Sequence, residues 1–222
     1  MRSLVLCALV VAGSLWGAPV AVGNPVGCLT LGGVVQNGGV CQVRDSQPSY
    51  TMDVTFPLGY PDSQAVIDYL GQTKAGFLNL AQTPGSPNLP YEMDVTGESF
   101  ASAQTRSLVL TLFQAVGSAH PSTWYKSFTY DLGRARPVTF ETMFSPDAAP
   151  LDAIFPIVSR DLETRTGLSV LPGDGRDPAN YQNFAITDDA VIFFFGRAEM
   201  LPSYADAVSV SVPRDAIPPL QI

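Results

Sequence analysis

His120 is the only histidine in the 222-residue chain, so it is the one side chain suited to act as a base near neutral pH. A serine hydrolase needs a hydroxyl nucleophile beside such a base and an acid that orients it. Ser118, Ser122 and Asp131 are near His120 in sequence, but Pro121 beside it is more typical of a turn. No G-x-S-x-G, H-E-x-x-H or P-loop motif is present. We therefore expect a protein that is not an enzyme, with a His120-dependent hydrolase as an alternative.

Metal-binding patterns are weak in this sequence. The segment Gly173–Asp177 combines glycine and aspartate as a calcium loop does, but it lacks the alternating acids and the terminal glutamate of such a loop. Two cysteines and one distant histidine make a poor zinc set. We expect Gly173–Asp177 to be a solvated turn, and we expect no metal and no cofactor.

Aromatic residues gather in one stretch with the alternation of a strand. This alternation places Trp124, Lys126, Phe128 and Tyr130 on one face. Such side chains anchor protein partners or stack on sugar rings, and the same pattern also suits a face that covers a core. Trp124 and Lys126, together with His120, are candidate partner-binding residues.

The first residues have the pattern of an export signal. Arg2 precedes the apolar run Leu4–Val11, and small residues follow, with Ala21 and Gly23 at the two small positions of a cleavage site. The alternative is a membrane anchor, for which the run is too short. We predict a signal peptide over residues 1–23, an extracellular mature chain and no membrane span after cleavage.

Cysteine usage agrees with export. Cys7 falls within the predicted signal, which leaves Cys28 and Cys41 in the mature chain. An even number of cysteines in an exported protein predicts a disulfide. In the chain-entropy model a loop of this length stabilises the fold by about 3 kcal/mol.

Composition excludes two classes of protein. The formal net charge is −8, with 12 basic and 20 acidic residues, which argues against nucleic acid as the main partner. At 46% hydrophobic and 14% charged, the chain can bury a substantial core and is unlike a disordered protein.

The elements that must position these residues follow from periodicity. Residues 50–56 alternate as a half-buried strand, and a helix with Asp62 as its N-cap follows to about residue 80. Strands are expected at 91–100, 106–116 and 123–132.

The second half predicts a helix and three more strands. The helix covers 151–166 and ends at Gly167, and Pro156 is expected either to kink it or to mark its effective start. A hairpin pairs 184–186 with 191–195, and 208–212 is the last strand. Runs of strands with inserted helices predict an α+β fold, a mixed or mostly antiparallel sheet packed with two main helices, in one compact domain over residues 24–222.

The last third also carries a recognisable pattern. The stretch YQNFAITDD followed by VIFFF, then MLP and SVSVP, resembles the end of an RsiV-like extracellular domain, which would cover about residues 106–222. Together with the signal, the early cysteine pair and the YTMDVTFP strand, the whole chain is similar to the small secreted immunogenic antigens of mycobacteria.

This resemblance implies an exported α+β protein that host immunity recognises. In the anti-sigma factor RsiV the related domain binds lysozyme, and in some cell-wall deacetylases it lies beside the catalytic domain. The leading expectation is therefore a secreted non-enzymatic protein that binds a protein partner, with the host as one source of that partner. A cell-envelope glycan-binding module is the alternative.

One turn departs from the family pattern. The segment 197–206 lacks the common aromatic residue before Glu199 and has Asp206 where a glycine is expected. If this turn contacts the partner in RsiV-type domains, these departures argue against lysozyme as the partner. Tyr204, in the same turn, completes the set of candidate partner-binding residues.

Overall fold

The computed structural model describes residues 25–117 and 120–222. The predicted signal peptide (1–23) and Ser118 lie outside the described residues. The strands are β1 (Val34–Gln36), β2 (Val40–Gln47), β3 (Tyr50–Pro57), β4 (Tyr91–Ala101), β5 (Thr105–Ala115), β6 (Ser122–Asp131), β7 (Arg136–Pro137), β8 (Phe184–Ile186), β9 (Ala190–Phe195) and β10 (Val208–Pro213). The helices are α1 (Pro25–Thr30), α2 (Ser63–Gln82), α3 (Phe140–Met143), α4 (Pro150–Thr166), α5 (Pro172–Gly175), η1 (Pro178–Tyr181) and η2 (Arg214–Ala216).

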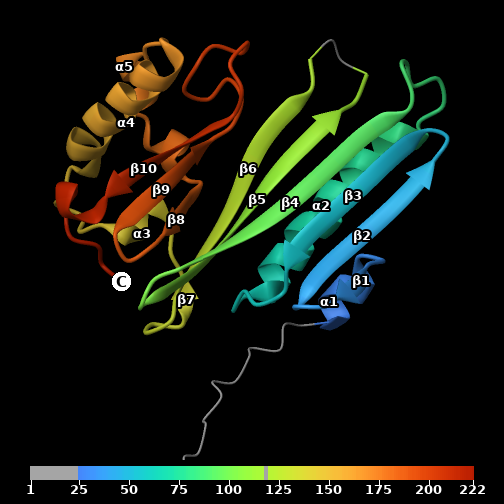
Figure 1. The fold of residues 1–222 in the computed structure, drawn as a ribbon, viewed down its shortest axis with the longest axis horizontal. Coiled ribbons are helices and arrows are strands. Elements are labelled where there is room, and N and C mark those ends of the chain that lie inside the picture. Colours follow the sequence, from blue (N-terminus) through green and yellow to red (C-terminus); the bar gives the residue numbers. More distant parts are fainter. Residues whose placement is uncertain (1–24, 118–119) are drawn as a thin grey trace, which may run out of the picture.

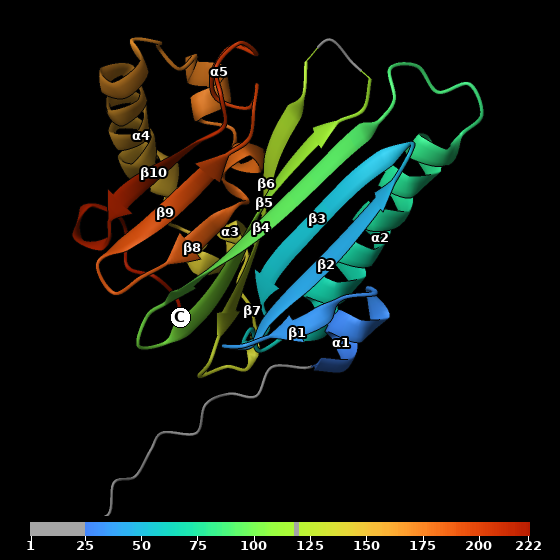
Figure 2. The ribbon, with the colours of Figure 1, turned by 45° about the vertical axis from the view of Figure 1, so that its right-hand side comes forward.

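The larger sheet contains strands β1 to β7 in sequence order. Neighbouring strands are antiparallel except β3 and β4, which are parallel. Parallel neighbours require a long connection, and α2 supplies it. Figure 1 shows α2 behind the strands, and Figure 2 shows it along one face of the sheet. One face of the larger sheet is therefore covered by a helix.

Helix α2 begins and packs as its sequence predicts. The side chain of Asp62 accepts a hydrogen bond from the backbone N–H of Ala65 at 3.4 Å. Its buried residues recur at helical spacing and face the sheet. With residues of β2 to β5 they form the first core, whose buried members include Val54, Phe56, Val66, Leu70, Phe77, Met93, Leu108, Leu110 and Leu112.

The predicted disulfide joins α1 to the larger sheet. Cys28 of α1 and Cys41 of β2 are fully buried, and their sulfur atoms are 2.02 Å apart. The prediction of a Cys28–Cys41 disulfide is confirmed. The cross-link fixes this short helix against the edge of the first core.

The smaller sheet has the order β10-β9-β8 and is antiparallel throughout. Helix α4 contains Pro156 and ends at Gly167, whose φ of 71° is left-handed and therefore favours glycine. This half has its own core, rich in rings that contact one another: Phe140, Phe144, Tyr181, Phe184, Phe193 and Phe195.

The two sheets meet through hydroxyl groups. The N–H of Phe184 in β8 donates to the Ser127 hydroxyl at 2.8 Å, and its carbonyl accepts from the Thr129 hydroxyl at 3.1 Å. The N–H of Ile186 donates to the Ser107 hydroxyl at 3.2 Å. Hydroxyl groups of the larger sheet thus form the hydrogen bonds to the backbone of β8 that a neighbouring strand would otherwise form.

The α+β fold with a mostly antiparallel sheet is confirmed, with α2 and α4 as its two main helices. The hairpin of β1 and β2 was not predicted, because its turn residues Gly38 and Gly39 suggested only a loop. Both have left-handed φ angles, 84° and 73°. Within the described residues, no helix combines the length and the apolar character that a membrane span requires.

Candidate functional site

The start of β6 and the segment after β9 enclose a hollow of about 440 Å³. This volume lies in the range of roughly 300–1,000 Å³ that is typical of small-molecule sites. The residues that line it come from both segments: His120, Pro121, Ser122, Thr123, Trp124, Arg197, Ala198, Ser203 and Tyr204.

Arg197 holds the two walls of this hollow together. Its backbone N–H donates to the carbonyl of Thr123 at 2.9 Å, which docks the segment after β9 onto β6. Its guanidinium donates to the carbonyl of Pro121 at 2.7 Å and to that of Ser203 at 2.5 Å. One cationic side chain therefore fixes the positions of both walls while it lines the space between them.

A second contact shapes the turn beside Arg197. The carboxylate of Glu199 accepts from the backbone N–H of Gly196 at 2.7 Å. A Cβ added at Gly196 would lie 3.2 Å from the Cα of Trp124, so the absence of a side chain lets this turn approach β6 closely. The wall that carries Ser203 and Tyr204 is thus set by local geometry as well as by Arg197.

Three of the four predicted partner-binding residues come together here. His120, Trp124 and Tyr204 all line the hollow, and Tyr204 is 73% exposed at its rim. The indole N–H of Trp124 also donates to the Tyr69 hydroxyl of α2 at 3.0 Å, which holds the ring in place. A role of these residues in partner binding stays a prediction.

Lys126 lies elsewhere. Its ammonium group is 5.8 Å from the centre of the Tyr69 ring and 5.4 Å from that of Phe128. It lines a separate hollow of about 210 Å³ near the start of α2. The fourth predicted residue is therefore not brought to the His120 hollow.

Asp131, near His120 in sequence, is placed far from it by the strand between them. A strand rises about 3.3 Å per residue, so the two ends of β6 are tens of ångströms apart. The Asp131 carboxylate instead accepts from the backbone N–H and the guanidinium of Arg134, at 3.0 and 2.9 Å. These bonds lower the pKa of Asp131. Asp131 does not orient His120.

Sequence reasoning did not identify Arg197 and Ser203 as site residues. Both belong to a turn about 80 positions along the chain from His120, and only the docking of that turn on β6 brings them close. No local pattern marks this contact. The hollow contains no acidic lining residue, and the described part of the chain has no group of three or more histidines, cysteines or acids placed to hold a metal ion.

Comparisons with known proteins show two kinds of similarity. The family model described as "Protein of unknown function (DUF3298)" matches residues 141–215, within the part that resembles an RsiV-like domain. A crystal structure of a DUF3298 family protein from Pseudomonas aeruginosa has a TM-score of 0.54 at 11% identity, covering 82% of this chain and 94% of that one. At this identity the similarity concerns the fold alone.

Two relatives that match most of the chain are mycobacterial proteins. The chain is 52% identical over 230 residues to a Mycobacterium tuberculosis protein named "Esterase Rv3036c", covering 100% of both. It is 40% identical to the "Immunogenic protein MPB64" of Mycobacterium bovis, covering 81% of this chain and 82% of that protein. The second name agrees with the expected antigen family, while the first leaves the expectation of a non-enzymatic protein unconfirmed.

Proposed function

The chain belongs to the mycobacterial family that includes Rv3036c and the immunogenic proteins MPB64 and MPT64, and from this we propose that it is an exported hydrolase of small esters acting at the His120 hollow. The observation that carries the proposal is the hollow itself. Its lining includes the only histidine of the chain together with two serines and one arginine. The name of the 52% identical relative supports the same reaction class.

The hydroxyl of Ser122 or Ser203 is the nucleophile of the proposed reaction. It attacks the ester carbonyl while the His120 imidazole takes its proton, and a tetrahedral intermediate forms. When the carbon–oxygen bond to the alcohol breaks, His120 returns the proton to the leaving oxygen. A water molecule then attacks the acyl-serine by the same proton route, which releases the carboxylic acid and restores the serine.

Arg197 is suited to stabilise the negative oxygen of the tetrahedral intermediates. Its guanidinium lines the hollow and is already oriented by the carbonyls of Pro121 and Ser203. A cation held in place before the reaction needs little rearrangement when charge develops. An aromatic rim of Trp124 and Tyr204 would pack against the apolar part of the ester.

The test is hydrolysis of p-nitrophenyl acetate by the purified chain. We expect His120→Ala to lower kcat/KM about 100-fold or more, since general acid–base groups contribute roughly 10²–10⁴. Ser46→Ala is the matched control. It removes an exposed hydroxyl on β2 that does not line the His120 hollow, and it should leave the rate unchanged. Labelling with a fluorophosphonate followed by peptide mass spectrometry identifies whether Ser122 or Ser203 reacts. Unchanged hydrolysis in His120→Ala, or absence of any activity, would overturn the proposal.

A second candidate function is binding of a protein partner, and the exposure of Tyr204 favours it. A tyrosine that is 73% exposed beside Trp124 has the character of an interface anchor. We expect the immobilised folded chain to retain one protein from host-cell extract or culture filtrate, and Tyr204→Ala to lose it while Ser46→Ala keeps it. Retention on purified peptidoglycan, insensitive to Tyr204→Ala, would instead favour the glycan-binding alternative.

A further inference from the structure

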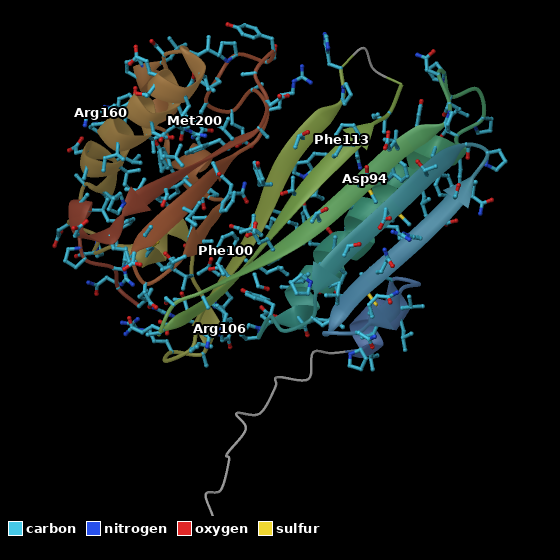
Figure 3. The ribbon with its side chains drawn as sticks, viewed as in Figure 1. Asp94, Phe100, Arg106, Phe113, Arg160 and Met200 are labelled. Atoms are coloured by element: carbon cyan, nitrogen blue, oxygen red, sulfur yellow. A yellow bond between two sulfur atoms is a disulfide. The ribbon has the colours of Figure 1, made fainter. Side chains whose placement is uncertain are left out.

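A second and larger hollow, of about 590 Å³, lies at the opposite end of the larger sheet from His120. Its walls come from the paired ends of β4 and β5, from the segment that follows β3, and from α1, β1 and the turn before β2. Figure 3 labels Arg106 and Phe100 at this end of the sheet. Its lining includes Val35 of β1, the segment from Pro57 to Tyr60, Ser99, and Arg106 of β5.

The hollow exists because α2 does not cover the whole sheet. Alternation along β5 places Arg106 on the same face as Leu108 and Leu110, which are buried under α2. Helix α2 begins at Ser63, and Arg106 lies beyond the residues that it covers and is exposed. The core face of the sheet thus continues past the helix and carries a cation at its end.

Arg106 is positioned by the protein but has no acidic partner. One of its terminal nitrogens donates to the carbonyls of Ser102 and Thr105, each at 2.8 Å. Unlike Arg44, Arg134, Arg165 and Arg176, it forms no salt bridge with the residues that the structure describes. The guanidinium is therefore oriented by backbone contacts, with its remaining N–H groups available to an anion.

Tyr60 is a second, independent polar group in this hollow. It is only 8% exposed, and its hydroxyl forms no hydrogen bond with any described residue. Burial raises the pKa of Tyr60, so its hydroxyl stays protonated and is a potential donor. Among the described residues no buried side-chain polar atom lacks a partner, so this hydroxyl reaches solvent and adds a polar donor to the wall of the hollow.

The remaining walls are mainly apolar, with Ser99 and Ser107 as their other polar members. Val35 lines the hollow and is 43% exposed. Pro57 and Leu58 continue this apolar surface toward the core. Because the chain has an overall net charge of −8, an anion would approach only where a local cation attracts it. A mainly apolar space with one cation at its end fits a molecule with an apolar chain and a carboxylate head.

We propose that this hollow binds the carboxylate form of a single-chain fatty acid, with its head group on Arg106 and its hydrocarbon chain along Val35, Pro57 and Leu58. The site is separate from the His120 hollow, so the proposal does not depend on ester hydrolysis. The expected ligand is recognised by charge and by apolar surface together.

Calorimetric titration of the purified chain with dodecanoate, below the concentration at which it forms micelles, tests the proposal. We expect one molecule bound per chain, and Arg106→Gln to weaken binding at least about tenfold, as expected for loss of a charge-assisted contact. Dodecanol, which has the same chain but no charge, should bind at least about tenfold more weakly than dodecanoate. Arg160→Gln, on the exposed face of α4, is the matched control and should not change binding.

A second variant tests the space itself. A Cβ added at Gly59 would meet no atom within 4 Å, so Gly59→Phe should fill the hollow without disturbing the core and should abolish binding. Circular dichroism verifies that each variant is folded. Equal affinity for dodecanol and dodecanoate, binding that survives Gly59→Phe, or no binding at all would each overturn the proposal.

Discussion

The two cores of the molecule are built on different plans. The first core rests on long regular elements, with the 20-residue helix α2 against strands of eight to eleven residues, and a disulfide at its margin. The second core is closed by short segments, such as η1 and β9, whose rings interlock. Tyr181 of η1 contacts both Phe193 and Phe195 edge to face, with centroids 5.2 and 5.5 Å apart.

This difference shows which residues determine the packing of each core. In the first core, apolar residues at periodic positions determine which face is buried, and the stabilisation is distributed over many of them. In the second, a few rings hold segments that have little regular structure of their own, so single residues matter more. Breaking one ring should cost more than breaking any other single feature of the fold.

The largest effect is expected from Tyr181→Ala. Tyr181 is fully buried, and its hydroxyl donates to the carbonyl of Gly175 at 2.7 Å. We expect the free energy of unfolding to fall by about 3–5 kcal/mol, as for other large-to-small changes of buried aromatic residues. Urea denaturation followed by circular dichroism measures the change. Tyr181→Phe, which keeps the ring, should cost only about 1 kcal/mol, and a similar loss in both variants would contradict the ring-based account.

Removing the disulfide should act on the first core. The chain-entropy model predicts that Cys28→Ser with Cys41→Ser lowers the free energy of unfolding by about 3 kcal/mol for a loop with a separation of 13 residues. Thermal unfolding of the double variant gives the value, and wild-type protein treated with a reductant is its control. Hydrogen exchange should increase first in α1 and β2, and an increase that begins in β9 instead would show that the two cores are not distinct.

The junction between the cores is tested by Thr129→Val. This change keeps the shape of the side chain but removes the hydroxyl that bonds to the carbonyl of Phe184 and to Ser107. A buried carbonyl left without its donor costs about 1–3 kcal/mol, and we expect a loss near 2 kcal/mol. Thr51→Val, on the exposed face of β3, should be nearly neutral. If both variants are equally stable, the hydroxyl contacts do not hold the two sheets together.

The smallest effect is a pH dependence at the far end of the junction. Arg134 links Asp131 to the carbonyl of Gln221 near the chain end, and hydrogen bonds from Arg134 lower the pKa of Asp131. A carboxyl group whose pKa is lower in the folded state stabilises the fold above its unfolded pKa of about 3.9. This stability is lost as the pH falls below about 4.

Asp131→Asn should therefore lower stability by about 1 kcal/mol at pH 7 and flatten its pH dependence below pH 4. Denaturation midpoints between pH 2.5 and 7 provide the measurement. Asp94→Asn, at an exposed position on β4, serves as the control. A steeper acid transition in Asp131→Asn than in the wild type would refute the assigned sign.

Sequence alone predicted β3 to β6, α2 with its Asp62 cap, and α4 with its Gly167 end, because each depends on local periodicity or capping. It also selected His120, Trp124 and Tyr204. It did not predict that Arg197 and Ser203 would join them, since that contact depends on how β9 docks on β6. The sequence also did not show that β6 would separate Asp131 from His120. Residues about ten positions apart lie at opposite ends of an extended strand of this length.

The hydroxyl groups of Ser107, Ser127 and Thr129 have a further consequence. An unpaired strand edge is a template on which other chains assemble into aggregates. These hydroxyls close the outer edge of β8. At the other side of the smaller sheet, Arg165 donates to the carbonyl of Ser209 at 2.7 Å, and β10 ends at a proline. The smaller sheet is thus shielded at both edges from pairing with a strand of another molecule.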